Sequence, residues 1–274
     1  MSMTTSITAA IVQMDSQNDK ALNTKKALAF CQEAVDRGSD IIVLPEVFNY
    51  RSNSLEMKAA AEPIPGPTTA LFSEFARQQQ VTIVMGSIVE VGDGDKCYNS
   101  SVVIAESGEI AGVYRKMHLF NVDVEGKSIQ ESKAFLAGET PVCMEWKDRK
   151  LGLSICYDVR FPELYRHYAT QGATILTAPS SFTYPTGEAH WEILLRARAI
   201  ENQCFILAPN QVGLGAESVP TYGNSMIVDP WGKVVVRANE TDECVLVAQL
   251  DTDFLENIRR SFPCLNHQAF TSQQ

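Results

Sequence analysis

The sequence predicts a single domain of the α/β class, built as a layered sandwich with helices outside and sheets inside. Short strand-like runs alternate with longer helical patterns along the whole chain. Several strands are continuous apolar runs, which is typical of sheets buried on both faces. The 274 residues, of which 45% are hydrophobic, supply a large core, and no repeat, low-complexity tract or Pro/Ser linker divides them.

The N-terminal half predicts strands and two amphipathic helices. The expected strands are short runs rich in apolar residues, at 7–14, 40–46, 81–91 and 97–116. One helix is expected over 21–38, because Gly38 supplies a stop signal at its end. A second helix is expected over 66–80, with Pro67 near its start.

The C-terminal half continues the alternation after a long interruption. Residues 117–140 are polar and irregular and predict a long loop, and such loops in compact domains are often functional. Helices are expected over 162–173 and 190–203, with a loop at 181–189 before the second helix. The expected strands lie at 150–156, 174–180, 204–211, 223–230, 233–238 and 243–251.

The helix expected over 190–203 has two apolar sides. One side carries Trp191, Leu194, Leu195 and Ala199, and the other carries Ile193, Ala197 and Ile200. Such a wide stripe exceeds what a helix with one solvent-facing side needs. The pattern predicts either a deeply packed helix or a helix with one side against a second subunit.

Composition excludes several classes of partner and compartment. The net charge is 23 − 33 = −10, which argues against nucleic acid or an anionic membrane as a partner. The seven cysteines are scattered without a CxxC motif, which predicts free thiols in a reducing cytoplasm. No basic residue precedes Lys20, so the sequence lacks a signal-peptide pattern, and no apolar run approaches the ~18 residues of a membrane span.

Three polar residues stand at the ends of predicted strands. Glu46 follows "IIVLP", Lys116 ends "GVYRK", and Cys156 ends "LGLSI". Reactive groups of α/β proteins gather at the carboxyl ends of strands, where loops form a crevice. Taken singly, these residues also have ordinary interpretations as a solvated carboxylate, a surface charge and a small core thiol.

Together the three residues fit nucleophilic catalysis on an amide. Glu46 is expected to take the thiol proton of Cys156, because burial makes a carboxylate a better base. Lys116 and the backbone N–H of Tyr157 are expected to stabilise the oxyanion that forms on attack. Cys156 also lies near a predicted helix start, where the helix dipole favours a thiolate.

Two other site chemistries compete with this one. A Cys–His peptidase would need His118 or His190 as its base, and the sequence leaves that alternative open. A metal site is not expected, since His167 stands alone and no HxxE, HxH or CxxC spacing occurs. No Gly-rich phosphate loop is present either, so no cofactor is predicted.

Three segments carry a family resemblance. "LPEVF", "YRKMHLF" and "SICYDVRFPELYR" resemble the signature segments of the nitrilase (carbon–nitrogen hydrolase) superfamily. The resemblance implies a four-layer αββα sandwich, a single domain over 1–274 with its core at about 7–265, and a catalytic triad of Glu46, Lys116 and Cys156. It also implies assembly as a homodimer or larger homo-oligomer.

Further wording resembles the Nit-type amidases of that superfamily. "QES" resembles the position of a second glutamate, here Glu131, which would orient the lysine and the substrate. "SFTYPTGEAHWEILLRARAIENQC" and "YGNSMIVDPWG" resemble the branch that contains deaminated-glutathione amidases and ω-amidases. In that branch the residues matching Arg160, the Phe182 backbone and the Thr186 hydroxyl belong to the substrate pocket.

Arginine suits this role because its guanidinium binds carboxylates in a bidentate manner. The alternative for Arg160 is a structural ion pair with Asp158 or Glu163. The sequence departs from the common wording of the branch at Asn121, in place of aspartate, and at Asn224, in place of histidine. By analogy both lie near the pocket rim, and the unusual segment 49–60 is expected to contribute to specificity.

The resemblance therefore implies a cytoplasmic, cofactor-free amidase acting on a small-molecule amide. It would hydrolyse a small carboxylate-bearing amide to acid and ammonia through a cysteine thioester, with deaminated glutathione as the expected substrate. One alternative is an ω-amidase acting on 2-oxoglutaramate or 2-oxosuccinamate. Another, of a different class, is a catalytically idle ligand-binding regulator on the same fold.

Overall fold

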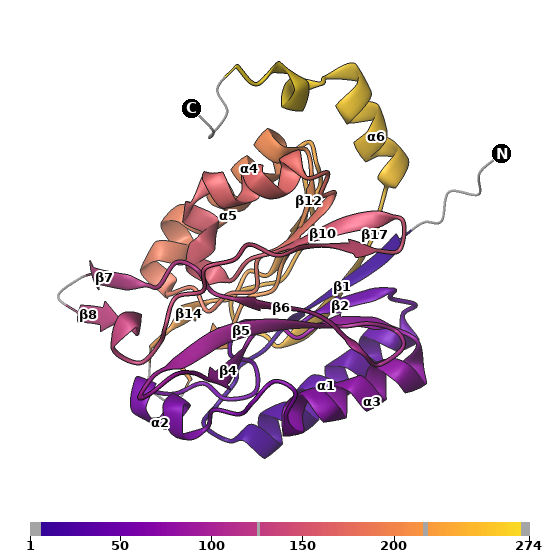
Figure 1. Cartoon of the computed structure of the whole chain (residues 1–274). Coiled ribbons are helices and arrows are strands. Elements are labelled where there is room, and N and C mark those ends of the chain that lie inside the picture. The colour runs from indigo at the N-terminus through magenta and orange to yellow at the C-terminus, as the bar shows by residue number, and fades with distance from the viewer. Residues whose placement is uncertain (1–6, 125–126, 216–218, 270–274) are drawn as a thin grey trace.

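The computed structural model of the chain describes residues 7–124, 127–215 and 219–269, so both ends of the predicted domain lie outside the described residues. Two sheets lie face to face, and helices cover the outer face of each (Figure 1). This is a four-layer αββα sandwich, as predicted.

The first sheet contains the N-terminal strands and one late strand. Its order is β17-β1-β2-β3-β5-β4, with β6 paired to β5. The bounds are β1 (Ile7–Gln13), β2 (Ile41–Val43), β3 (Thr82–Val84), β4 (Ile88–Val91), β5 (Cys97–Ile104), β6 (Ile110–Arg115) and β17 (Cys244–Leu250). Helices α1 (Lys20–Asp36) and α3 (Pro67–Gln79) cover its outer face (Figure 1).

The second sheet has the order β16-β15-β12-β11-β10-β9. The bounds are β9 (Cys143–Trp146), β10 (Arg149–Leu153), β11 (Ile175–Thr177), β12 (Phe205–Ala208), β15 (Met226–Val228) and β16 (Val234–Arg237). Helices α4 (Pro162–Thr170) and α5 (Tyr184–Asn202) lie on its outer face (Figure 1). Because β10, β11 and β12 are parallel, their carboxyl ends share one edge of the sheet.

Alternation along each strand explains why the strands read as continuous apolar runs. In β1, Ile11 belongs to the core between the two sheets, whereas its neighbour Val12 packs in the core under α1 and α3. Both side chains are fully buried. A sheet covered on both faces needs apolar residues at both sets of positions.

Two predicted loops contain regular structure. The segment 117–140 holds a hairpin of β7 (Asn121–Val124) and β8 (Lys127–Gln130), followed by a 3-10 turn at Glu131–Lys133. The loop predicted at 181–189 is also wrong, because α5 already begins at Tyr184. Gly187 lies in the first turns of this helix, although glycine is typical of loops. It is needed there because a Cβ atom would lie 2.3 Å from the Tyr222 Cβ.

Several short elements were not predicted. Besides β9, they are α2 (Ser54–Ala59), the paired strands β13 (Val212–Gly213) and β14 (Thr221–Tyr222), the helix α6 (Thr252–Ser261) and a 3-10 turn at Cys264–His267. β13 and β14 matter below because Leu214 and Val219, which lie between them in sequence, line the functional cavity. Within the described ranges, no helix is long and apolar enough to cross a membrane.

The two apolar sides of α5 differ in burial. Trp191, Leu195 and Ala199 are fully buried against the second sheet. Ile193 and Ile200 are 71% and 48% exposed. The deep packing that the sequence suggested therefore applies to one side of the helix only.

Candidate active site

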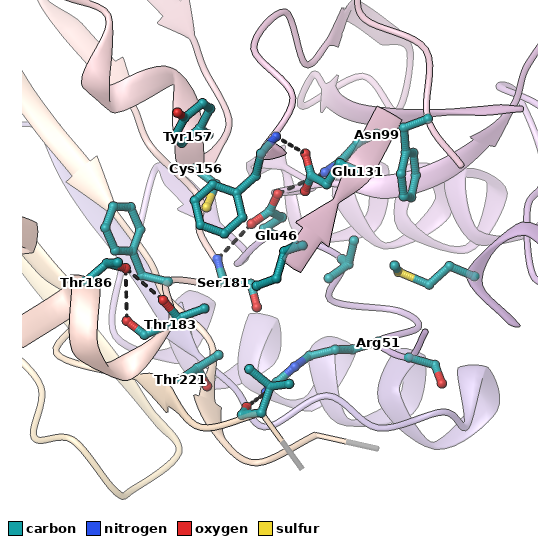
Figure 2. A pocket seen from close by; sticks show the side chains of 18 of the residues that line it. Glu46, Arg51, Asn99, Glu131, Cys156, Tyr157, Ser181, Thr183, Thr186 and Thr221 are labelled. Atoms are coloured by element: carbon teal, nitrogen blue, oxygen red, sulfur yellow. Dashed lines mark hydrogen bonds between the residues drawn. The ribbon is translucent and has the colours of Figure 1, made fainter. Parts of the chain in front are cut away.

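The structure brings the predicted catalytic residues together where strands of both sheets end. Glu46 follows β2, Lys116 follows β6, and Cys156 follows β10. Glu46 and Cys156 line the same cavity (Figure 2). Lys116 lies behind Glu46 with only 1% of its surface exposed.

Glu46 is held in one orientation by three donors. Its Oε1 accepts hydrogen bonds from Asn99 Nδ2 at 2.9 Å and from Lys116 Nζ at 3.0 Å. Its Oε2 accepts a hydrogen bond from the Ser181 backbone N–H at 2.8 Å (Figure 2). Because Asn99 belongs to the first sheet and Ser181 follows a strand of the second, Glu46 ties the two sheets together at the cavity.

Lys116 lies between two carboxylates. Its Nζ donates to Oε1 and Oε2 of Glu131 at 2.9 and 3.0 Å, besides its bond to Glu46. Glu131 is in turn oriented by the Phe120 N–H, which donates to Oε2 at 2.8 Å. Burial alone would lower the pKa of Lys116, but Glu131 and Glu46 raise it well above its usual range. Lys116 is therefore a fixed ammonium and not a base.

Cys156 has a strained backbone and a neutral thiol. Its φ of 49° lies in the left-handed region, and its N–H donates to the Pro179 carbonyl at 2.9 Å. Burial raises the pKa of the Cys156 thiol well above its usual range, and the negative charge of Glu46 raises it further. Lys116 opposes this shift without reversing it.

The prediction that a helix dipole favours a Cys156 thiolate is therefore wrong. Cys156 opens a 3-10 turn at Cys156–Arg160, and α4 begins only at Pro162. The dipole of α4 acts within its first turn, whereas burial acts directly on the sulfur. A thiol that stays protonated needs a base during attack, and Glu46 is the carboxylate beside it.

Asp158 fixes the turn that carries the nucleophile. It is fully buried; its Oδ2 accepts from Ile155 N at 2.8 Å and from Tyr114 OH at 2.7 Å. Its Oδ1 accepts from His118 N at 3.0 Å and lies 2.7 Å from His118 Nδ1. Tyr114 and His118 flank Lys116 in sequence, so this one carboxylate holds the Lys116 segment against the Cys156 turn.

Neither histidine proposed for a Cys–His enzyme is among the described residues that line the cavity. His118 bonds to Asp158 and stacks on Phe161 at 3.6 Å between ring centres. His190 Nδ1 lies 3.2 Å from Arg160 Nη1. In the described part of the chain, no group of three or more His, Cys, Asp or Glu residues is arranged to hold a metal ion.

The residues expected to bind substrate lie at one side of the cavity. Tyr157, Arg160, Phe182 and Thr186 all line it. The Arg160 guanidinium carbon is 5.2 Å from the Phe182 ring centre, and this geometry allows a cation–π contact. Neither Asp158 nor Glu163, both within the described ranges, forms an ion pair with Arg160, so the structural alternative is not supported. The Phe182 N–H donates to Asn210 Oδ1 at 3.0 Å and its carbonyl accepts from the Tyr222 N–H at 2.9 Å, so both backbone groups of Phe182 already have partners within the protein.

The cavity has a volume of about 210 Å³. A single water needs only about 10–15 Å³ on this measure, so the space admits an organic substrate. Besides residues of the segment 49–60, its described walls contain residues that sequence reasoning missed, namely Val47, Asn99, Phe120, Ile129, Gln130, Phe135, Ser181, Thr183, Leu214, Val219 and Thr221. For Ser181, a place after the carboxyl end of β11 was a usable signal; for Asn99, within a strand, we see none.

The unusual positions of the sequence differ in their distance from this cavity. Arg51, Ser52 and Met57 of the segment 49–60 line it, as expected of a specificity loop. Asn121 and Asn224 are not among its described lining residues. Asn121 accepts from Ser132 N at 3.1 Å, and the Asn224 carbonyl accepts from Trp191 Nε1 at 2.9 Å, so both act in the scaffold.

Comparison with known proteins agrees with this geometry. Residues 8–260 match the model of the carbon–nitrogen hydrolase family. The chain belongs to the carbon–nitrogen hydrolase family. It is therefore an enzyme that hydrolyses carbon–nitrogen bonds, and the alternative of an idle binding protein is not supported.

Relatives at similar identity place this enzyme among the amidases. It is 39% identical over 267 residues to a deaminated glutathione amidase of Synechocystis sp., covering 96% of this chain and 98% of that protein. It is 37% identical over 260 residues to the ω-amidase NIT2 of Mus musculus, covering 94% of each. The structure of Saccharomyces cerevisiae Nit3, a member of branch 10 of the nitrilase superfamily, superposes with a TM-score of 0.87 at 33% identity, covering 97% of both chains.

Proposed function

We propose that this amidase hydrolyses deaminated glutathione through a thioester on Cys156. The observation that carries the proposal is the buried Glu46 carboxylate, held beside a neutral thiol and a fixed ammonium. Arg160 at the wall of the same cavity supplies a charge for the carboxylate of the acyl group. The 39% identity to a deaminated glutathione amidase supports the choice of substrate.

Acylation needs one proton carried by Glu46. As the Cys156 Sγ attacks the amide carbon, its proton passes to Glu46, and the S–C bond forms. Lys116 and the Tyr157 N–H stabilise the negative charge on the carbonyl oxygen. Glu46 then returns the proton to the amide nitrogen, the C–N bond breaks, and the amine leaves a thioester behind.

Deacylation uses the same residues with water as the nucleophile. Glu46 takes a proton from water as its oxygen attacks the thioester carbon. The tetrahedral intermediate expels the Cys156 sulfur, which recovers its proton through Glu46. A neutral resting thiol is the end point of this cycle, and the raised pKa of Cys156 is consistent with it.

The leaving group depends on the substrate. The scissile nitrogen of deaminated glutathione belongs to its cysteinylglycine part, so the product is that amine and not ammonia. Ammonia is released only from a primary amide such as 2-oxoglutaramate, which has the same acyl group. An ω-amidase acting on that amide or on 2-oxosuccinamate is the second candidate, because the mouse ω-amidase is almost equally similar to this chain.

Replacing the nucleophile tests the mechanism. Cys156→Ala is expected to lower kcat by ~10⁴-fold or more for both amides, because the thioester cannot form. Release of cysteinylglycine and of ammonia is measured separately, with folding checked by circular dichroism. Cys143→Ala, at a half-buried thiol that is not among the described lining residues of the cavity, is the control and should keep full turnover. Unchanged turnover in Cys156→Ala would exclude the mechanism.

We also propose a homodimer or larger homo-oligomer in the cytoplasm. Ile193 and Ile200 of α5 are exposed apolar side chains. Ile200 lies against Gly232, and the neighbouring Trp231 is 61% exposed, so these residues form one apolar surface. A second copy would cover this apolar surface. Light scattering should give a multiple of the 30.2 kDa chain mass, and Ile193→Asp should lower it. All seven cysteines are free thiols, which agrees with a reducing compartment.

A further inference from the structure

The cavity extends to both sides of the Glu46 carboxylate. Thr186 lies on one side of Glu46 and Arg51 lies on the other, well separated in the view (Figure 2). Arg160, Phe182 and Thr186 form the side assigned above to the acyl group. The opposite side has no role in that assignment, although it is part of the same continuous cavity.

The walls of this second side are largely apolar and come from separate segments. Val47 lies in the connection after β2 and Met57 lies in α2, and both pack in one cluster with Phe135. Leu214 and Val219 come from the connection between β13 and β14. Leu214 is 55% exposed although it lines the cavity, so it offers apolar surface that a ligand can cover.

Arg51 holds the β13–β14 wall in place. Its Nη1 and Nη2 donate to the carbonyls of Val212 and Val219, each at 3.2 Å, and its side chain is only 10% exposed. Gly215 packs directly on the guanidinium, because a Cβ there would lie 2.6 Å from Nε. Arg51 therefore bonds to the chain on both sides of Leu214 and acts as a positioning residue for that wall.

Geometry decides which part of an amide reaches this side. With its carboxylate at Arg160 and its carbonyl carbon at the Cys156 sulfur, the substrate directs its amide nitrogen past Glu46. Glu46 must reach that nitrogen to protonate it. Any substituent on the nitrogen therefore points away from Arg160, toward Met57 and Leu214.

We propose that this side is a leaving-group subsite for the N-substituent of a secondary amide, such as a small peptide amine with an apolar or thiol side chain. The inference rests on the proposed function and selects between its two candidates. A primary amide carries only hydrogen atoms on its nitrogen and leaves the subsite empty. The subsite thus favours deaminated glutathione over 2-oxoglutaramate.

These two amides form a matched pair for the test, because they share the acyl group and differ only in the N-substituent. Leu214→Ala and Arg51→Met are expected to lower kcat/KM for deaminated glutathione ~10-fold, mainly through KM. The same variants should change kcat/KM for 2-oxoglutaramate less than ~2-fold. Val219→Trp fills the subsite instead of emptying it, and it should also lower kcat/KM for deaminated glutathione more than for 2-oxoglutaramate.

Two controls separate this inference from the proposed function. Arg160→Met should lower kcat/KM for both amides, because it acts on the shared acyl group. Leu22→Ala, at a leucine of α1 that is 53% exposed, should change neither. If Leu214→Ala and Val219→Trp affect both amides equally, or neither, the leaving-group subsite is overturned while the proposed function stands. A wild-type enzyme that hydrolyses neither amide overturns both.

Discussion

The catalytic centre and the wall that Leu214 and Val219 contribute to the same cavity are built in opposite ways. Glu46 and Lys116 are 4% and 1% exposed, and charged or backbone partners fix each of them. Leu214, across the cavity, is 55% exposed and offers only apolar surface. The difference places the reacting groups in a buried polar network, whereas the proposed subsite leaves the choice of amide to side chains that fold stability hardly constrains.

Removing the base should have the largest effect of the changes that test this comparison. Glu46→Gln is expected to lower kcat by ~10²–10⁴-fold, because no group remains to move the proton from sulfur to nitrogen. The same change removes the negative charge beside Cys156, so the pKa of its thiol should fall relative to the wild type. Assays of amide hydrolysis measure the first effect.

The pH dependence of Cys156 alkylation by iodoacetamide, followed by peptide mass spectrometry, measures the second. The midpoint in Glu46→Gln should lie at lower pH than in the wild-type enzyme. Faster alkylation together with slower hydrolysis would separate thiolate formation from catalysis. An unchanged or higher midpoint would show that Glu46 does not act on the thiol.

A smaller effect is expected at the buried acceptor behind the nucleophile. Asp158→Asn replaces one carboxylate oxygen with an NH₂ group. In one orientation this group faces the Ile155 N–H and the Tyr114 OH, and in the other it faces the His118 N–H. The lost acceptor should cost about 1–3 kcal/mol of unfolding free energy. Displacement of the Cys156 turn from Lys116 should lower kcat ~10-fold with little change in KM.

Denaturant unfolding and steady-state kinetics measure these effects. Asp148→Asn, at a carboxylate whose side chain is 69% exposed, is the matched control and should behave as wild type. A change in stability without a change in kcat would make Asp158 a purely structural residue.

The smallest effect on stability is expected at the wall. Leu214→Ala should change the unfolding free energy by less than about 0.5 kcal/mol, since its side chain is already exposed to solvent. The same variant discriminates between the two amides in the test described above. A marked loss of stability here would contradict the contrast between centre and wall.

The sequence was informative where function depends on strand ends. Glu46, Lys116 and Cys156 were predictable because each lies at the end of a strand, where the loops of an α/β fold form a crevice. Their meeting was not predictable from strand order, because β6 is antiparallel to β5 and β10 belongs to the other sheet. Motif wording added Glu131 and Arg160. The layer order was predictable because continuous apolar strands require cover on both faces.

The sequence was least informative where contacts join distant segments. The hydrogen bond from Arg51 to the Val219 carbonyl joins residues 168 positions apart in the sequence, and no local sequence pattern predicts it. The neutral state of the Cys156 thiol also depends on burial by the whole fold, and this outweighed the local dipole argument. The start of α5 was placed too late because Gly187 is typical of loops. In the structure this glycine leaves room for the Tyr222 side chain, which packs against the helix.

Mass spectrometry of the trapped acyl-enzyme tests the central claim most directly. The enzyme is mixed with deaminated glutathione or with 2-oxoglutaramate, quenched in acid and digested. The same acyl mass is expected on the Cys156 peptide from both amides, because both leaving groups depart before the thioester accumulates. An active enzyme with no adduct at Cys156, or with an adduct that retains the amine, would contradict it.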